Sequence, residues 1–308
     1  MRVVIALGGN ALLRRGEPLE ADVQQRNVAV AASALAEVAR EHAVVVTHGN
    51  GPQVGLLALQ ALAYREVRPY SLDVLGAESE GMIGYFIERE LSARLPGREV
   101  ATLLTQVEVD RNDPAFAAPV KPIGPVYSEA EARQLHDRLG FAIARDGAGF
   151  RRVVPSPEPR RIRELAAIRL LVEAGVVVIC VGGGGIPVVA AAGGGIVGVE
   201  AVIDKDLAAS LLAVELGAAA LLLLTDVAAV ETGWRSPQAR KIREASPQAL
   251  RAESFEAGTM APKIEAAARF VERTGGFAGI GALAAAAEVL RGAAGTIVRP
   301  GTKPIAWY

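Results

Sequence analysis

Short runs of β-branched and other apolar residues alternate along the chain with longer stretches in which alanine and leucine recur at helical spacing. The strand-like runs lie at 2–7, 43–47, 100–104, 176–181, 219–224, 277–280 and 296–299. The helical stretches lie at 21–40, 52–64, 71–95, 167–174, 204–216, 261–273 and 283–291. This alternation is typical of a mainly parallel sheet with helices on both faces, so we predict an α/β fold.

Two segments depart from the alternation. Residues 186–202 hold two apolar pieces around the sequence AAGGG, which predicts a β-hairpin rather than a crossover. Residues 117–159 break the rhythm of strands and helices and have prolines clustered at both ends. We expect this excursion to form a lid or a small protruding subdomain rather than a linker.

Length and charge bound the class of protein. With 308 residues the chain can form one large α/β unit or two modest lobes. No apolar run approaches the ~18–20 residues of a membrane helix, and the short apolar start is broken by Gly8, so we expect neither a membrane anchor nor a secretory leader. The net charge of −1 gives no general attraction to nucleic acid. The single cysteine, Cys180, excludes an intramolecular disulfide and fits a reducing cytoplasm.

Glycine-rich turns follow three of the predicted strands. The first strand ends in Gly8-Gly9-Asn10, the second in THGNGPQVG at 47–55, and a later one in VGGGGI at 181–186. Glycines let backbone N–H groups approach an anion closely, and two such loops lie in one crevice if their strands are neighbours. A Gly-Gly after a strand is also an ordinary tight turn, so these loops alone leave both interpretations open.

Two further patterns were weighed as sites. His48 at the end of the second strand could act as a general base, although a strand-end histidine more often holds a turn by hydrogen bonding. The sequence GGGIVG at 193–198 has the spacing of a dinucleotide-binding loop, but it lies inside the predicted hairpin instead of opening a helix, so we reject that interpretation. A Walker A pattern is absent, which excludes a P-loop kinase.

Lysine is scarce, and its positions are informative. The chain has five lysines among 33 basic residues, and Lys121, Lys205 and Lys263 stand beside clustered glycines, prolines or acids. Lysine is a compact point charge that fits against one phosphate oxygen, unlike the wide fork of arginine. Lys205 lies between two acids where a helix should begin, which ordinary capping also explains. In the functional interpretation Lys205 meets phosphate, while Asp206 orients lysines or supports Mg²⁺.

Lys263 begins another predicted helix, where N–H groups and an ammonium together hold an anion. Thr225-Asp226-Val227 ends the preceding strand, at the edge where parallel sheets meet ligands. Phosphoryl transfer needs reactants in line and cations over the transferring oxygens, and little covalent chemistry from the protein. Lysines, glycine N–H groups and a magnesium ion supply that, so the pattern favours a kinase with a non-P-loop site.

Nine segments together resemble the amino-acid kinase family and, within it, the carbamate kinases. They are ALGGNALL, THGNGPQVG, EGMIGY, KPIGP, FRRVVPSP, CVGGGGIPV, EAVIDKDLAA, LLLLTDV and GTMAPKIEAA. Each alone is unspecific, whereas their order and spacing are highly specific and cover nearly the whole chain.

The resemblance implies an open αβα sandwich formed by a single domain, 1–308, in a homodimer. About 1–200 would hold carbamate or carbamoyl phosphate, about 201–308 would hold the nucleotide, and 117–159 would be lid-like. The implied reaction is reversible phosphoryl transfer between ATP and carbamate, with Mg²⁺, giving ADP and carbamoyl phosphate. Such enzymes usually run toward ATP in arginine or purine breakdown.

The resemblance also implies roles for individual residues. Those expected around carbamate and the moving phosphoryl group are Gly8, Gly9, Asn10, Asn50 and Gly51. Lys121 would swing over the carbamoyl phosphate end, and Asp206 would hold Lys205 and Lys263 across the nucleotide phosphates. Those expected to line the nucleotide pocket are Thr225, Asp226, Val227 and Met260.

Two positions depart from expectation. Ala6 stands where acetylglutamate kinases and their relatives place a lysine, and Lys205 is the candidate supplier of that charge. Glu80 stands where we expect a glutamine. The alternatives are a kinase of a larger acid, such as acetylglutamate or aspartate, and a non-catalytic protein that binds nucleotide or carbamoyl phosphate. Ala6 and KPIGP count against the first, and the presence of the lysines with Asp206 counts against the second.

Overall fold

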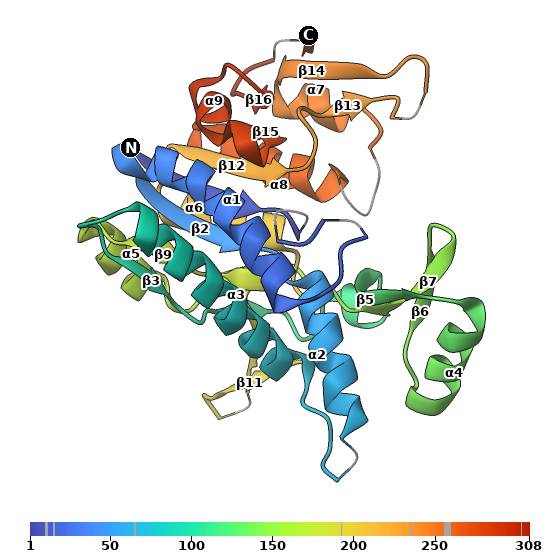
Figure 1. Cartoon of the computed structure of the whole chain (residues 1–308). Helices are drawn as coiled ribbons and strands as arrows, with labels where there is room; N and C mark the ends of the chain where they lie inside the picture. Colours follow the sequence, from blue (N-terminus) through green and yellow to red (C-terminus); the bar gives the residue numbers. More distant parts are fainter. Residues whose placement is uncertain are drawn as a thin grey trace.

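A computed structural model describes residues 1–9, 12–14, 16–64, 66–191, 193–234, 236–255, 260–302 and 304–308. Within this part, the central sheet has ten strands in the order β13-β14-β16-β15-β12-β1-β2-β9-β3, with β17 paired to β14 (Figure 1). Their bounds are β1 (Arg2–Leu7), β2 (Ala43–His48), β3 (Val100–Thr102), β9 (Val177–Ile179), β12 (Ala220–Thr225), β13 (Glu231–Thr232), β14 (Arg240–Ala245), β15 (Phe277–Ala282), β16 (Thr296–Val298) and β17 (Ala306–Trp307). Every pairing from β15 through β12, β1, β2 and β9 to β3 is parallel, which confirms the predicted fold class.

Helices cover both faces of this sheet. The α-helices are α1 (Ala21–Glu41), α2 (Gly51–Ala63), α3 (Leu72–Arg94), α4 (Glu129–Leu139), α5 (Leu165–Glu173), α6 (Lys205–Glu215), α7 (Pro247–Arg251), α8 (Met260–Thr274) and α9 (Ala286–Arg291). Short 3₁₀ turns among the described residues include η2 (Pro114–Phe116), η3 (Gly182–Gly184) and η4 (Leu283–Ala285). The bounds of the longer helices agree with the predicted ranges to within a few residues.

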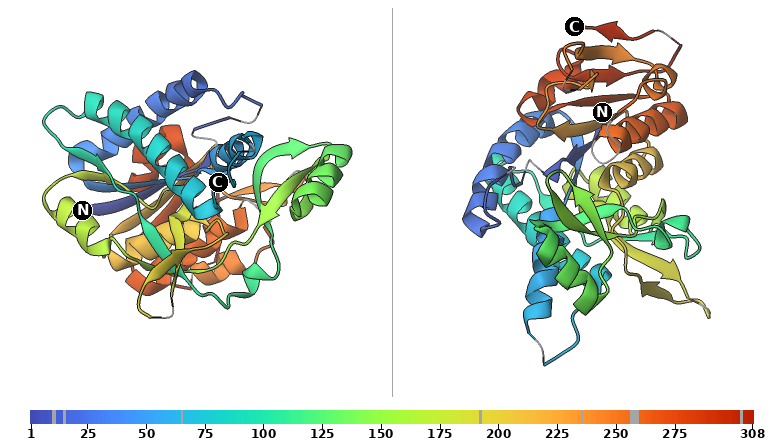
Figure 2. Two further views of the ribbon diagram at one scale, coloured as in Figure 1. Left: turned by 90° about the horizontal axis from the view of Figure 1, so that it is seen from below. Right: turned by 90° about the vertical axis from the view of Figure 1, so that its right-hand side faces the viewer.

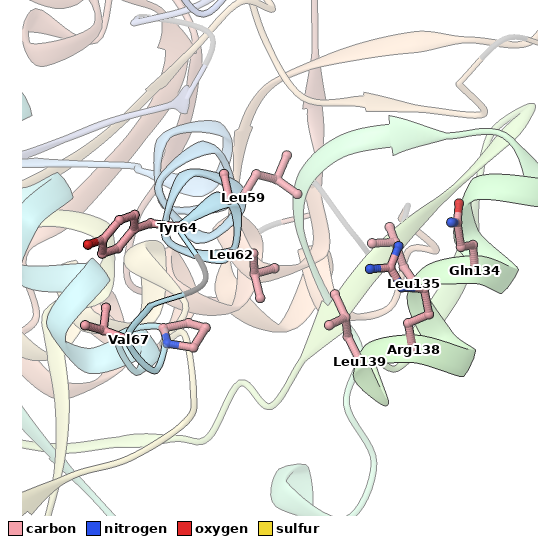
Figure 3. A pocket seen from close by; sticks show the side chains of 10 residues that line it. Leu59, Leu62, Tyr64, Val67, Gln134, Leu135, Arg138 and Leu139 are labelled. Atoms are coloured by element: carbon pink, nitrogen blue, oxygen red, sulfur yellow. The ribbon is translucent and has the colours of Figure 1, made fainter.

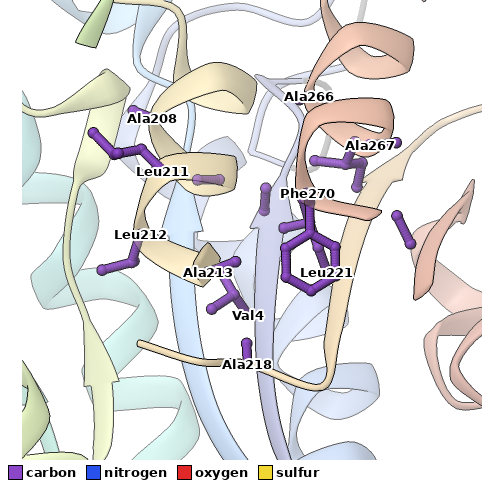
Figure 4. Close-up of a cluster of buried hydrophobic side chains, with 14 of the residues drawn as sticks. Val4, Ala208, Leu211, Leu212, Ala213, Ala218, Leu221, Ala266, Ala267 and Phe270 are labelled. Carbon is purple, nitrogen blue, oxygen red and sulfur yellow. The ribbon is translucent and has the colours of Figure 1, made fainter. Parts of the chain in front are cut away.

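Alternating side chains on the central strands build two separate cores. Val3 and Ile5 point to the core under α1, α3 and α9, whereas Val4 and Ala6 point to the core under α5, α6 and α8. Figure 4 shows the second core, where side chains of α6 and α8, including Phe270, gather over Val4 and Leu221 of the sheet. Because both faces are buried, the central strands are apolar throughout instead of alternating apolar and polar residues.

A second sheet flanks the body, in the order β11-β10-β4-β8. Its strands are β4 (Gln106–Val109), β8 (Pro159–Ile162), β10 (Ile186–Ala190) and β11 (Ile196–Gly198). The antiparallel pairing of β10 with β11 confirms the predicted hairpin. The sequence GGGIVG therefore opens no helix, as expected when the dinucleotide interpretation was rejected.

A third sheet stands apart from the body (Figures 1 and 2). It consists of β5 (Lys121–Tyr127), β6 (Ile143–Asp146) and β7 (Gly149–Val154) in the order β5-β7-β6, and it carries α4. We call residues 121–154 the protruding segment. Its first and last residues are paired, Lys121 opposite Val154, so the chain enters and leaves at neighbouring points.

The protruding segment meets the body where β5 crosses α2. A Cβ added to Gly55 of α2 would lie 2.0 Å from the Cα of Gly124 in β5. Gly124 also has a φ of +73°, in the left-handed region that favours glycine. Glycine at both positions therefore allows the two backbones to touch at the base of the segment.

Several strands differ from the sequence-based prediction. The strand expected to be the last, at 296–299, is followed by β17, and β3 ends at Thr102 instead of Leu104. The strands β4, β8, β13 and β14 were not predicted. They are short, or charged as in RKIREA of β14, so their sequences lack a sustained apolar pattern. In the described residues, no helix combines the length and apolar character needed to cross a membrane.

Candidate active site

The carboxyl ends of three neighbouring parallel strands meet at one edge of the sheet. β1 lies between β12 and β2, so the loop after β1 is flanked by the ends of the other two. Gly8 N donates to Leu224 O at 2.8 Å, and Gly49 N donates to Leu7 O at 3.1 Å. A Cβ on Gly8 would lie 3.8 Å from Thr225 Oγ1. Of the substrate-loop residues named from the sequence, Asn10 lies outside the described residues.

Lys205 reaches this edge from the start of α6. A Cβ on Gly49 would lie 3.3 Å from both Cδ and Cε of Lys205 and 3.4 Å from Gly9 N. The aliphatic stem of the lysine therefore runs against the backbone of the second glycine loop, next to the first. Glycine at 49 leaves room for that stem, which the sequence alone did not indicate.

The sequence left open whether the acids around Lys205 cap a helix or orient lysines, and the structure shows both, at different residues. Asp204 is the N-cap of α6, since its Oδ1 accepts from Asp206 N at 2.9 Å and from Leu207 N at 3.3 Å. Asp206 instead accepts from two lysines: Lys205 Nζ at 2.6 Å and Lys263 Nζ at 2.9 Å. Capping thus uses Oδ1 of Asp204, whereas both oxygens of Asp206 serve lysines.

Lys263 comes from the first turn of α8, which begins at Met260. Its side chain is 10% exposed, and that of Asp206 is 5% exposed. Met260 is half-buried and packs against the core under α6 and α8. The lysine therefore combines a helix N-terminus with a buried counter-ion, the setting in which an ammonium group is held in one orientation.

Lys121 joins the same cluster from the protruding segment. Its Nζ donates to Asp204 Oδ2 at 2.5 Å, and its side chain is 28% exposed. Three lysines from three distant parts of the chain thus lie on two adjacent carboxylates. We call Lys121, Asp204, Lys205, Asp206 and Lys263 the lysine cluster, and its formal charge is one positive.

Burial and pairing set the charges in the lysine cluster. Burial, reinforced by the like charge of Lys263, lowers the pKa of Lys205 to about 8 even though Asp206 opposes the shift. Burial alone would raise the pKa of Asp206, but Lys205 and Lys263 outweigh it and lower that pKa below its usual range. The attraction of Asp206 likewise outweighs burial and raises the pKa of Lys263. The carboxylates are therefore ionised at neutral pH, and the cluster suits an anion.

Asn50 follows Gly49, the residue against which the stem of Lys205 packs. It is the N-cap of α2, which begins at Gly51, and its Nδ2 donates to Ser79 Oγ at 2.9 Å. A Cβ on Gly183 would lie 2.1 Å from Asn50 Nδ2, so the amide packs directly on the third glycine loop. This loop therefore accommodates neighbouring side chains, which explains its run of glycines.

His48 is enclosed beneath the same loop. It is fully buried, its Nδ1 lies 3.2 Å from Gly49 O, and its Nε2 has no hydrogen-bond partner among the described residues. Burial lowers the pKa of His48 to about 4, so the ring is neutral at neutral pH. The contact with Gly49 is the turn-holding contact weighed against the general-base role.

Glu80 is a buried carboxyl that the sequence analysis left without a role. It lies on α3, is 1% exposed, and accepts from Gly182 N at 2.8 Å and Thr105 N at 3.2 Å. Burial raises the pKa of Glu80 to about 8 despite these two hydrogen bonds. It ties the third glycine loop to the segment after β3. In the sequence, the signal for a buried Glu80 was its place among the apolar positions of a predicted helix.

The residues named for the nucleotide pocket lie at the ends of β12 and α8. Thr225 Oγ1 donates to Asp226 Oδ1 at 3.0 Å, and Thr225 and Val227 are half-exposed. A separate groove of about 450 Å³ lies away from the lysine cluster, between the end of α2 and α4. Figure 3 shows Leu59 and Leu62 facing Leu135 and Leu139 across it. Its apolar lining does not suit a polyphosphate.

Comparisons with known proteins identify the family to which the chain is similar. Residues 1–277 match the model of the amino acid kinase family. The carbamate kinase of Rhizobium meliloti is 54% identical, over 100% of this chain and 96% of its own. Solved carbamate kinases from Giardia lamblia include one bound to citric acid, with a TM-score of 0.91 and 40% identity, and one bound to AMP-PNP, with a TM-score of 0.88 and 41% identity. Each alignment covers 97% of this chain and 98% of the other.

Proposed function

The chain belongs to the amino acid kinase family and has carbamate kinase activity, and we propose that the lysine cluster is where it moves a phosphoryl group between ATP and carbamate. The observation that carries this proposal is the meeting of three scarce lysines on Asp204 and Asp206, beside two glycine loops. The family, fold and activity rest on the comparisons. The assignment of residues is our own.

Carbamate binds, in this proposal, against the loops after β1 and β2. Gly9 and Gly51 offer backbone N–H groups without side chains in the way, and Asn10 and Asn50 add side-chain amides. Gly8, whose N–H donates to Leu224 O, holds the loop against the end of β12 beside the carbamate. The stem of Lys205 lies against Gly49, so its ammonium is within reach of whatever these loops bind.

The transfer itself takes place between that acid and the nucleotide. An oxygen of carbamate forms a bond to the γ-phosphorus as the bond to the bridging oxygen breaks, and ADP leaves with that electron pair. Lys205 and Lys263 donate to the phosphoryl oxygens and stabilise the charge spread over them. Asp206 fixes both ammonium groups, so little reorganisation is needed during the reaction.

Lys121 covers the carbamoyl phosphate end. It extends from the protruding segment, which stands apart from the body. The reverse reaction uses the same contacts, with ADP attacking carbamoyl phosphate. We propose that cells run it toward ATP, in arginine or purine catabolism.

The nucleotide lies, in this proposal, along Thr225, Asp226, Val227 and Met260. Met260 shares the first turn of α8 with Lys263, and Thr225 stands next to Gly8. We expect the phosphates to point toward the lysine cluster and the adenosine end to lie away from the carbamate loops.

Magnesium is part of the proposal as a companion of the nucleotide. No group of three or more His, Cys, Asp or Glu side chains in the described residues could hold a metal ion. Both oxygens of Asp206 are taken by lysines. Mg²⁺ keeps several waters and binds substrate phosphates with one or two carboxylates, so these residues fit an ion that arrives with ATP or ADP. When bound, it neutralises charge on the β- and γ-phosphate oxygens.

A homodimer and a cytoplasmic location complete the proposal. Tyr85 of α3 and Leu104 after β3 are 56% and 51% exposed, and a Cβ on Gly81, one turn before Tyr85, would lie 3.8 Å from Leu104 Cδ2. We propose that these two side chains belong to the dimer interface, since contiguous exposed apolar patches mark interaction sites. The single cysteine, Cys180, is a buried free thiol, in keeping with a reducing compartment.

One assay tests the activity directly. Purified protein mixed with ADP, Mg²⁺ and carbamoyl phosphate should form ATP, whereas ATP with acetylglutamate or aspartate should give no phosphorylated acid. Turnover of either amino acid at a comparable rate would favour the kinase of a larger acid. Binding of carbamoyl phosphate without any ATP would point to a non-catalytic protein.

A further inference from the structure

Asp204 uses its two oxygens for two different partners. Oδ1 accepts from the backbone N–H groups of Asp206 and Leu207, which closes the first turn of α6. Oδ2 accepts from Lys121 Nζ at 2.5 Å. Its side chain is only 14% exposed, so this second contact is shielded from water.

Capping a helix requires only one of these oxygens. Asparagine and serine cap about as well as aspartate, because a single acceptor satisfies the first N–H groups. A negative charge at Asp204 is also unfavourable by itself, because it is buried and lies near Asp206. Burial alone would raise the pKa of Asp204, but the attraction of Lys121, with a smaller contribution from Lys205, outweighs burial and the repulsion from Asp206 and lowers that pKa. The charge of Asp204 therefore has a use that capping does not explain.

That use is to fix the position of Lys121. The two residues are 83 positions apart, and the contact joins the protruding segment to the helix that carries Lys205 and Asp206. An ammonium group has three N–H donors, so Lys121 can keep Asp204 as a partner and still donate to a substrate oxygen.

We propose that Asp204 is a positioning residue, whose second oxygen holds Lys121 of the protruding segment over the phosphoryl-transfer site. This rests on the proposed role of Lys121 at the carbamoyl phosphate end. Without the carboxylate, Lys121 loses its anchor while α6 keeps its cap. Lys205 and Lys263 keep their hydrogen bonds to Asp206, so the nucleotide end of the cluster keeps its direct contacts.

The test is Asp204→Asn, which keeps the capping oxygen and removes the charge. In the ATP-forming direction we expect kcat/KM for carbamoyl phosphate to fall about tenfold, the loss of one charge-assisted hydrogen bond. KM for ADP and the melting temperature should stay close to those of the unchanged protein. Asp204→Ser, a second capping residue without charge, should give the same loss.

The matched control is Asp113→Asn. Asp113 also caps a short helical turn, since its Oδ1 accepts from Ala115 N at 2.9 Å, but it contacts no lysine in the described structure. Its replacement should leave the kinetics unchanged. A comparable kinetic loss at Asp113 would overturn the proposal.

A double-mutant cycle with Lys121→Met separates positioning from other effects. If Asp204 acts through Lys121, adding Asp204→Asn to Lys121→Met should change kcat/KM for carbamoyl phosphate no further. Normal kinetics for Asp204→Asn, or losses that multiply in the double variant, would overturn the inference. Normal use of carbamoyl phosphate by Lys121→Met alone would instead remove the role of Lys121, and failure of the unchanged protein to form ATP would remove the proposed function.

Discussion

The buried carboxylate of Asp206 lies between two ammonium groups. Each lysine is therefore held by a negative charge that is shielded from water. In the cluster, Lys205 and Lys263 share this partner. Removing either lysine leaves Asp206 with one cation and removes a positive charge from the phosphoryl group. The effect should be on turnover more than on folding, because one pair remains.

Lys205→Met and Lys263→Met test this. We expect each to lower kcat by about 10²–10³-fold, the scale found when one donor to a developing charge is removed. Steady-state assays of ATP formation measure it. Lys241→Met is the matched control, since Lys241 is an exposed lysine of β14 that lies 3.7 Å from Glu231. Turnover within tenfold of normal in both cluster variants would refute their roles.

Glu80 makes a prediction about pH. Its pKa is about 8 in the folded protein against an ordinary value of 4.5. Between these two values the folded protein keeps a proton that the unfolded chain has released, so the contribution of Glu80 to stability falls as pH rises through this window. Glu80→Gln cannot ionise. Its melting temperature relative to the unchanged protein should therefore rise from pH 5 to pH 9.

The control for Glu80 is Glu78→Gln, an exposed position of the same helix. Melting curves of the three proteins across this pH range give the comparison. A difference between Glu80→Gln and the unchanged protein that stays constant with pH would show that Glu80 is ionised throughout.

At the residue scale, the sequence readily indicates which residues are functional. It does not indicate which of them contact one another. The lysines stood out because they are scarce. The partners of Glu80, by contrast, are backbone groups 25 and 102 positions away, and Asp204 meets Lys121 across 83 positions. Contacts of this kind depend on the fold, and no local pattern encodes them.

At the scale of elements, the crossing of β5 over α2 fixes where the protruding segment begins. Gly55 and Gly124 touch there, close to Lys121 at the start of β5. Gly55→Ala would place a Cβ 2.0 Å from the Cα of Gly124. Backbone must then move, which we expect to destabilise the protein by about 1–3 kcal/mol and to impair the use of carbamoyl phosphate.

Gly76→Ala provides the contrast within a helix. A Cβ on Gly76 of α3 would meet nothing within 4 Å, so alanine should stabilise the helix by up to about 1 kcal/mol. Denaturant unfolding of both variants measures the difference. Equal stability of the two alanine variants would contradict the close crossing.

The predictability of elements followed their burial. Central strands such as β1 and β12 were predicted because both of their faces are apolar, and α8 because its apolar residues recur at helical spacing. β14 was missed because Ile242 and Ala245 are the only apolar residues of RKIREA, and they stand three apart instead of at the two-residue period of a strand. β4 and β8 were missed because they pair outside the central sheet, where no strand-helix alternation marks them.

At the scale of the whole molecule, the exposed apolar residues around Tyr85 and Leu104 bear on assembly. Tyr85→Glu combined with Leu104→Glu should shift the proposed homodimer toward monomer, since charge would be buried at the interface. Size-exclusion chromatography with light scattering measures the mass. Tyr64→Glu, at another exposed tyrosine, should leave the mass unchanged. A monomeric unchanged protein would remove the dimer from the proposal.

The pairing of Lys121 with Val154 has a consequence for how this architecture can vary. Because the chain leaves the body and returns at adjacent points, residues 122–153 form an insertion that is joined to the body only at its base. Insertions, deletions or exchanges around α4 should change the stability of the central sheet little. The requirement that remains is the contact between the Lys121 ammonium and Asp204. We therefore expect the part of the protruding segment around α4 to vary widely among relatives that keep the same chemistry at Lys121.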